Sequence, residues 1–172
     1  RSTPGGNSGG TNSGEGIYLG VIGFNDQQYV KNIGLLNNST VYDYTDFIDG
    51  LSKGNGTGLY YADYTALKMM RECAAPPKLK NVALVTFTDG LDNISLANDS
   101  YNPENYNSTN AYREALHNMI TNEQIHGLNV AAYTIGLKGN DVTDDNLFME
   151  TLQKLASSNN NVFQVSNMNE AI

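Results

Sequence analysis

The strongest constraint on the fold is an alternation of apolar, strand-like runs with segments of helical periodicity. The runs cover residues 17–24, 82–88, 129–137 and 162–165, and they are rich in β-branched and aromatic side chains. The run that begins at Val82 has the composition of a strand buried on both faces. Strands that alternate with helices favour a parallel sheet flanked by helices. We therefore predict an α/β fold, doubly wound, with a mostly parallel sheet and helices on both faces.

The segments between these runs place apolar residues at helical spacing. We predict helices over residues 44–51, 59–73, 111–126 and 144–157, with Gly127 ending the third and Thr143 starting the fourth. A short hairpin or edge segment is expected at residues 28–30, and a last helix from Asn169. Residues 1–16 carry no hydrophobic side chain and are rich in Gly, Ser and Asn, which predicts a flexible linker before one domain over residues 17–172.

Composition narrows the class of protein. A chain of 172 residues with 40% hydrophobic residues is long enough to bury a substantial core, and no apolar run is long enough to cross a membrane. The net charge of −8 comes from 18 acidic and 10 basic residues, which disfavours nucleic acid and anionic lipid as partners. The single Cys73 has no partner for an internal disulfide, and we interpret it as a small buried residue.

Two loops contain residues that suit a hard cation. The run at 82–88 ends in Asp89-Gly90, and open α/β sheets place their ligand sites just past the carboxyl ends of strands. A glycine-rich loop containing Thr57 precedes the helix predicted at residue 59, so both loops can meet at one edge. A hydroxyl and a carboxylate are oxygen ligands of the kind that Mg²⁺ prefers. The alternative is structural: Asp-Gly as an ordinary turn, and Thr57 as a helix cap.

The order and separation of these segments resemble a von Willebrand factor type A domain. The resemblance rests on the Gly-x-Thr loop at residues 54–62, the Thr-Asp-Gly turn at residues 88–90, and the later segments at residues 129–137 and 152–165. It covers about residues 17–172. The resemblance implies a doubly wound sheet with a metal-ion-dependent adhesion site, in which Thr57 and Asp89 occupy two ligand positions.

Further expectations follow from that resemblance. The metal would be Mg²⁺, or Mn²⁺ or Ca²⁺, and an acidic group of a protein or peptide ligand would complete its coordination. Asp92 and Asn93 would support the site or shape its loop, whereas Asp26 would be a solvated turn residue. Four tyrosines are candidates for ligand contact, because tyrosine offers amphipathic contact area at low entropic cost. They are Tyr60, Tyr61, Tyr101 and Tyr106.

The chain departs from the family pattern at one point. The first strand of the family ends in Asp-x-Ser-x-Ser and supplies further metal ligands, and no such segment is found before the run at residues 17–24. In the family this strand lies between those matched here by residues 17–24 and 82–88. Without it two strands would expose unpaired backbone. We therefore expect a separate N-terminal fragment, a segment left out of the chain, or a partner to supply it.

The leading functional hypothesis is a non-enzymatic, metal-dependent binding module on a cell surface or secreted. The alternatives are a scaffold subunit of an intracellular metal-dependent assembly and, less favoured, a metal-assisted hydrolase. The chain lacks a nucleophile elbow, a His-Glu zinc motif and a phosphate-binding loop, and His117 and His126 fall on a predicted helix away from Asp89. The Asn55 sequon includes Thr57, and a glycan there would obstruct the site, which favours a bacterial source.

Overall fold

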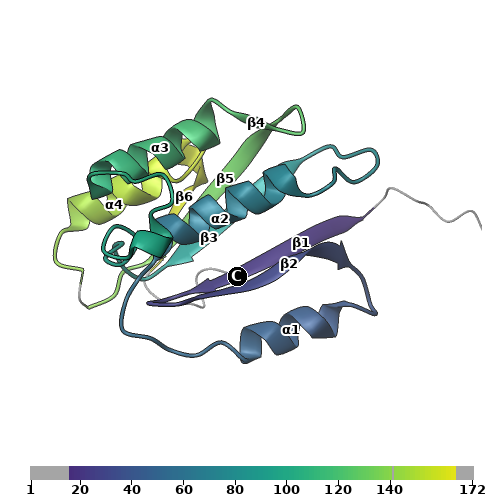
Figure 1. The fold of residues 1–172 in the computed structure, drawn as a ribbon, viewed down its shortest axis with the longest axis horizontal. Coiled ribbons are helices and arrows are strands. Elements are labelled where there is room, and N and C mark those ends of the chain that lie inside the picture. The colour runs from purple at the N-terminus through teal and green to yellow at the C-terminus, as the bar shows by residue number, and fades with distance from the viewer. Residues whose placement is uncertain (1–15, 141, 166–172) are drawn as a thin grey trace, which may run out of the picture.

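A computed structural model describes residues 16–140 and 142–165, which form two β-sheets with helices packed against them (Figure 1). The first sheet is a hairpin and the second is mostly parallel. The elements in chain order are β1 Ile17–Phe24, β2 Gln28–Leu36, α1 Val41–Asp49, α2 Leu59–Glu72, β3 Val82–Thr88, the 3-10 turn η1 Asp99–Tyr101, α3 Thr109–Thr121, β4 Gln124–Ile125, β5 Leu128–Leu137, α4 Asp145–Lys154, η2 Asn159–Asn161 and β6 Val162–Val165.

The hairpin of β1 and β2 is antiparallel and carries α1 on one side. The strand predicted at residues 28–30 extends to Leu36, so this segment is a full partner for β1 and more than a short edge piece. Tyr44 fixes α1 to the hairpin, because its hydroxyl lies 2.9 Å from the Leu19 carbonyl oxygen and 3.1 Å from that of Gly34. An α1 helix is thereby confirmed, beginning three residues earlier than expected.

The second sheet is built around β5. Strands β3 and β6 pair with β5 in parallel, and β4 pairs with its beginning in antiparallel fashion. Thr86 of β3 lies opposite Thr134 of β5, so the two residues share a face of the sheet. The α/β class with a mostly parallel sheet is confirmed.

Helices α2, α3 and α4 all pack on one face of this second sheet. Burial alternates along β3, with Val82, Leu84, Thr86 and Thr88 buried under the helices. Gly136 of β5 faces the same way, because a Cβ there would lie 2.5 Å from a Leu152 methyl of α4. The main core joins side chains of α2 and α3 to the helix-facing residues of β3 and β5.

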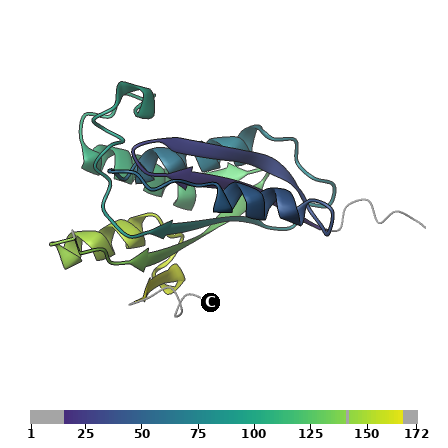
Figure 2. The same cartoon turned by 90° about the horizontal axis from the view of Figure 1, so that it is seen from below.

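The opposite face of this sheet is bare among the described residues, which corrects two expectations. Strand β3 is not buried on both faces, since Val85 is 51% and Phe87 50% exposed. Helices do not cover both faces of this sheet, because α2, α3 and α4 lie on the same side and α1 lies under the hairpin (Figure 2). The apolar composition of β3 thus indicated a buried strand, whereas the structure leaves every second residue uncovered.

Two helix ends also differ from expectation. Helix α3 ends at Thr121, and residues 124–137 then form a hairpin whose turn is His126-Gly127. Both turn residues have positive φ, 53° and 78°, as the tight turns of β-hairpins require, so Gly127 does not cap a helix. Helix α4 is capped by Asp144, whose side chain accepts a hydrogen bond from the Leu147 amide, and not by Thr143.

Helix α2 connects the two sheets. On one side Gln28 of β2 donates to the Thr65 hydroxyl (3.0 Å), and on the other Thr86 of β3 donates to Asp63 (2.8 Å). No strand pairing joins the hairpin to the second sheet within the described ranges.

Within the described residues, no helix is long and apolar enough to span a bilayer. The predicted linker before residue 16 and the predicted helix from Asn169 lie outside the described residues.

Candidate functional site

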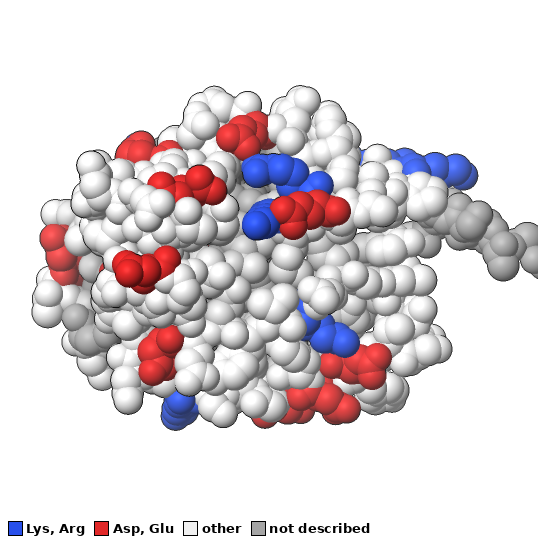
Figure 3. Space-filling view, viewed as in Figure 1, with Lys and Arg blue, Asp and Glu red and all other residues white. Residues whose placement is uncertain are grey.

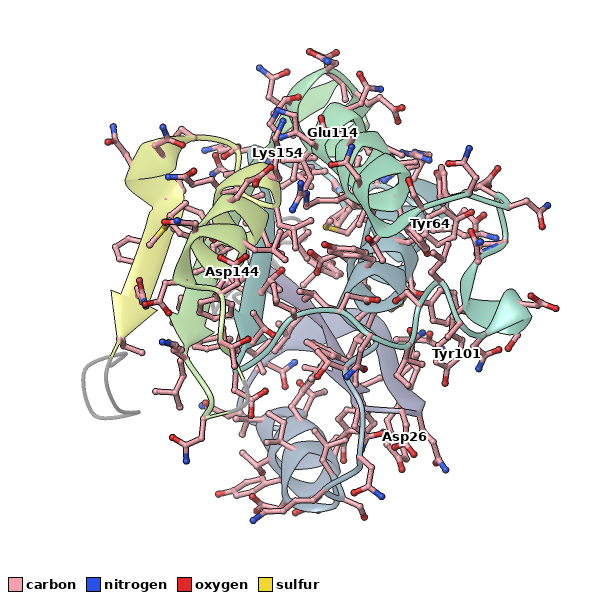
Figure 4. All side chains as sticks on the ribbon, turned by 90° about the vertical axis from the view of Figure 1, so that its left-hand side faces the viewer. Asp26, Tyr64, Tyr101, Glu114, Asp144 and Lys154 are labelled. Carbon is pink, nitrogen blue, oxygen red and sulfur yellow. The ribbon has the colours of Figure 1, made fainter. Side chains whose placement is uncertain are left out.

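The candidate site is the edge of the molecule where β1, β3 and β5 end and α2 begins. Figure 4 looks onto this edge: Asp26 and Tyr101 lie near each other on one side, and Asp144 lies across from them. The Tyr101 hydroxyl donates to the Asp26 carbonyl oxygen at 3.3 Å. The loop after β3 therefore folds back against the turn of the first hairpin, and the edge is formed by segments distant in sequence.

The two loops predicted to meet do so through Asn93. The Thr57 amide donates to the Asn93 side-chain oxygen (2.8 Å), and the Asn93 amide donates back to the Thr57 carbonyl oxygen (3.0 Å). The Gly58 amide donates to the Asn25 carbonyl oxygen at 2.9 Å, and the Gly139 amide to that of Asp89 at 2.7 Å. Asn93 thus connects the Thr57 loop to the Asp89 loop, in keeping with the expected loop-shaping role.

Glycine is required in the Thr57 loop because the neighbouring loop approaches closely. A Cβ on Gly56 would lie 2.6 Å from Ile94 Cγ1, which a side chain could not accommodate without a shift of the loops. The glycines of this loop do not have positive φ in this described segment. Their role is close approach, not an unusual turn.

Asp92 caps α2 from a distance. Gly58 occupies the N-cap position and has no side chain, and the Asp92 carboxylate instead accepts the Tyr60 amide at 2.9 Å. It also accepts the Ser95 amide (3.1 Å) and hydroxyl (2.5 Å). Burial raises the pKa of Asp92, although the hydrogen bonds from Ser95 and Tyr60 oppose this shift. Asp92 therefore holds its loop against α2 and caps the start of this helix. Thr57 is not the cap of α2.

Thr57 and Asp89 have side-chain oxygens available to a ligand. Asp89 is exposed and Thr57 half-buried, and the hydrogen bonds of both residues in the described part of the chain run through main-chain atoms. One hydroxyl and one carboxylate suit Mg²⁺, but they are two of the six oxygens that this ion requires. The described residues contain no cluster of three or more acidic, His or Cys side chains placed to hold a metal ion. The two side chains are of the chemical type that binds a cation, but two oxygens are too few to complete its coordination.

The tyrosines proposed as ligand contacts divide into two groups. Tyr60 is 4% exposed and packs against Tyr112 in the core, so it is not available at the surface, and this expectation is corrected. The other three are half-buried. Tyr61 stacks on Tyr101 with ring centroids 4.5 Å apart, and Tyr106 packs against Tyr112 at the same distance. Tyr60 was misassigned because its helix position alone does not reveal that Tyr112 of α3 packs against it.

Asp63 was not among the residues predicted from the sequence, yet its environment is unusual for an acidic side chain. Its side chain is 3% exposed, its Oδ1 accepts from Thr86, and its Oδ2 is buried without a partner among the described residues. Burial is the main cause that raises its pKa to about 7. The sequence did contain an indication of this. Asp63 lies between Leu59 and Leu67 on the apolar stripe of α2, where a charged side chain is unexpected.

The histidines lie away from the edge. His126 forms the turn at the opposite end of β5 from Asp89, where its Nε2 is 2.8 Å from the Met70 carbonyl oxygen and 3.9 Å from Cys73 Sγ. His117 Nδ1 lies 2.8 Å from the Lys154 carbonyl oxygen, between α3 and α4. Both are thus engaged with main-chain groups that hold elements together.

Comparisons with protein-family models, with curated proteins and with solved structures found no match for this chain. The resemblance to a von Willebrand factor type A domain accordingly stays a prediction.

Proposed function

We propose that this protein is a non-enzymatic, cation-dependent binding module of the von Willebrand factor type A kind. In this proposal Thr57 and Asp89 contribute to a site for Mg²⁺, or Mn²⁺ or Ca²⁺, at the edge where the strands end. The cation would supply positive charge at which an acidic group of a protein or peptide ligand is captured. A cell-surface or secreted protein would be the setting for such binding.

The observation that carries the proposal is the pairing of the two loops through Asn93. Two hydrogen bonds in opposite directions, of 2.8 and 3.0 Å, hold the Thr57 loop against the Asp89 loop, while the Thr57 hydroxyl and the Asp89 carboxylate have no hydrogen-bond partner among the described residues. Both oxygens are therefore available to an ion without the loss of a hydrogen bond within the described chain. Preorganised ligands also reduce the entropy lost when an ion binds.

Charge supports a cation as the mediator. The chain carries a net charge of −8, and acidic side chains are spread over its helix-covered face with no continuous basic patch (Figure 3). Such a surface repels an acidic ligand. A divalent ion held by Asp89 reverses the charge locally and gives an incoming carboxylate a direct bonding partner.

The test is Mn²⁺ titration followed by NMR, in which the paramagnetic ion broadens the amide signals nearest to it. We expect saturable broadening centred on Thr57, Asp89 and Asn93, reversed by a chelator. Asp89→Asn should weaken Mn²⁺ binding about tenfold or more, because it removes the anionic ligand. Thr57→Val should weaken it less, because a neutral ligand is lost.

Asp43→Asn is the matched control, since Asp43 is an exposed carboxylate in the first turn of α1, next to Tyr44, which bonds the start of β1 and the end of β2, away from this edge. It should leave the titration unchanged. Broadening spread over all exposed acidic residues, or an unaltered profile in Asp89→Asn, would contradict the proposed site.

A further inference from the structure

The loop before α2 is tied down at both ends and unbonded in its middle. The Asn25 side chain donates to the Ser52 carbonyl oxygen at 2.9 Å, and the Asn25 carbonyl oxygen accepts the Gly58 amide at 2.9 Å. Between these ties, residues 53–56 make no hydrogen bond to any other described residue. These residues, called the arch below, lie against the turn that contains Asp26 (Figure 4).

The arch contains Asn55-Gly56, the one place in the sequence where glycine follows asparagine. Asparagine is a thermolabile residue type, because its side chain can react with the following backbone amide. The Gly56 nitrogen forms a bond to the Asn55 side-chain carbonyl carbon, and the bond from that carbon to the side-chain nitrogen breaks. The side-chain nitrogen leaves as ammonia and takes the Gly56 amide proton with it. Water then opens the five-membered succinimide ring at either carbonyl, which gives aspartate or isoaspartate.

Hydrogen bonding separates this pair from the two Asp-Gly pairs of the chain, which could form the same ring. The Gly50 amide donates to the Asp46 carbonyl oxygen at 3.0 Å, where α1 ends. The Gly90 amide is buried and donates to the Thr88 hydroxyl at 3.3 Å. The Gly56 amide has no hydrogen-bond partner among the described residues. Its nitrogen can therefore attack without the loss of a hydrogen bond within the described chain.

Packing requires glycine at residue 56, so the reactive pair is built into this loop. A Cβ on Gly56 would lie 2.6 Å from Ile94 Cγ1 and 3.4 Å from the Asn93 side-chain oxygen, which itself accepts the Thr57 amide. Because glycine has no Cβ, nothing beside the attacking nitrogen hinders the ring. Asn55 is exposed, so water reaches the ring and ammonia can leave.

We propose that Asn55 is a self-modification site, at which the folded chain converts a side-chain amide into a carboxylate two residues before Thr57. Either product adds a negative charge to the Thr57 loop, and isoaspartate also adds a backbone atom to the arch. The conversion itself does not depend on a cation. Its consequence rests on the proposed function: an anionic oxygen on the loop of Thr57 attracts the divalent ion more strongly to a site with few oxygen ligands.

The test incubates the whole chain at neutral pH and follows it by tryptic mapping and mass spectrometry. Cleavage after Lys53 and Lys68 releases residues 54–68 as one peptide. This peptide should gain the mass of an amide-to-acid change and split into two chromatographic peaks, for aspartate and isoaspartate. The rate should lie within about tenfold of that of a synthetic peptide of residues 52–58, because the unbonded arch needs little local opening. Asn55→Gln is the matched control: it keeps the amide, would need a six-membered ring, and should stay unchanged.

A folded chain that reacts more than about tenfold slower than the synthetic peptide would overturn the proposal, because the fold would then protect the pair.

The consequence is tested separately with Asn55→Asp, which should bind Mn²⁺ about threefold more tightly than the unconverted chain. Equal affinity of these two chains, together with weaker binding in Asp89→Asn, would overturn the strengthening of the site and leave the proposed function intact. Absence of Mn²⁺ binding in every version would overturn the proposed function, whereas the conversion of Asn55 would still stand on its mass change.

Discussion

At the scale of single residues, Asp63 gives the chain a distinctive pH dependence. Its pKa is raised from 3.8 to about 7, chiefly by burial, so the folded state keeps a proton that the unfolded chain has lost. This contribution to stability is fully present below pH about 4 and is lost as the pH rises through 7. We predict that the free energy of unfolding falls by up to about 4 kcal/mol over that range.

Denaturant unfolding from pH 4 to 8 measures this, with Asp63→Asn as the comparison. The amide keeps a partner for Thr86 and does not ionise, so most of the slope should disappear in this variant. Burial also raises the pKa of Asp92, and a smaller slope of the same sign should therefore remain. A wild-type stability that rises with pH between 5 and 8 would refute the assignment.

At the scale of elements, the start of α2 depends on a loop distant in sequence. Asp92 accepts the Tyr60 amide and the Ser95 amide and hydroxyl, while Gly58 offers no cap of its own. We predict that Asp92→Ala lowers the free energy of unfolding by about 2 kcal/mol, because it removes a helix cap and leaves buried donors unsatisfied. Chemical denaturation measures the loss.

Asp99→Ala controls for the loss of an acidic residue from the same segment. Asp99 is exposed, and its hydrogen bond in the described chain uses its carbonyl oxygen, so the change should stay within about 0.5 kcal/mol of wild type. Equal effects of the two substitutions would mean that Asp92 does not act as the cap of α2.

At the scale of the whole molecule, the bare apolar face should govern solubility when nothing covers it. Phe87 and Phe163 are each about half exposed, whereas Phe148 is 1% exposed in the core. We predict that Phe87→Thr with Phe163→Thr reduces binding of a hydrophobic dye and slows aggregation, with a loss of stability under about 1 kcal/mol. Dye fluorescence and light scattering measure the outcome.

Phe148→Thr is the matched contrast, since it removes the same side chain from a packed position. It should lower the free energy of unfolding by about 3 kcal/mol or more and increase dye binding. If the double variant lost as much stability as Phe148→Thr, the sheet face would be buried in solution, and the 172-residue chain would cover it by itself or in a dimer.

Local sequence patterns determined most of the elements and their order. The apolar runs gave β1, β3, β5 and β6 with nearly correct ends, and helical spacing gave all four α-helices, because period and composition are local properties. One error in the predicted elements was also local in origin. The hairpin turn at His126-Gly127 was taken for the end of a helix, since both use glycine at positive φ.

The candidate site was partly visible in the sequence. Thr57 and Asp89 follow from the expectation that loops meet where parallel strands end, and the structure brings their loops together through Asn93. The bonding of Asp92 and the burial of Tyr60 were not accessible, because each depends on which distant loop packs against α2.

The sequence by itself therefore determined the α/β class, the order of elements and two residues suited to a cation. Only the tertiary structure decided which face of each strand is covered, and that, among the described residues, Asp63 has a buried oxygen without a partner and β1 and β3 each have one unpaired edge. The physical reason is that periodicity shows a side chain's direction relative to its own element. Burial and hydrogen-bond satisfaction depend on neighbours brought together from elsewhere in the chain.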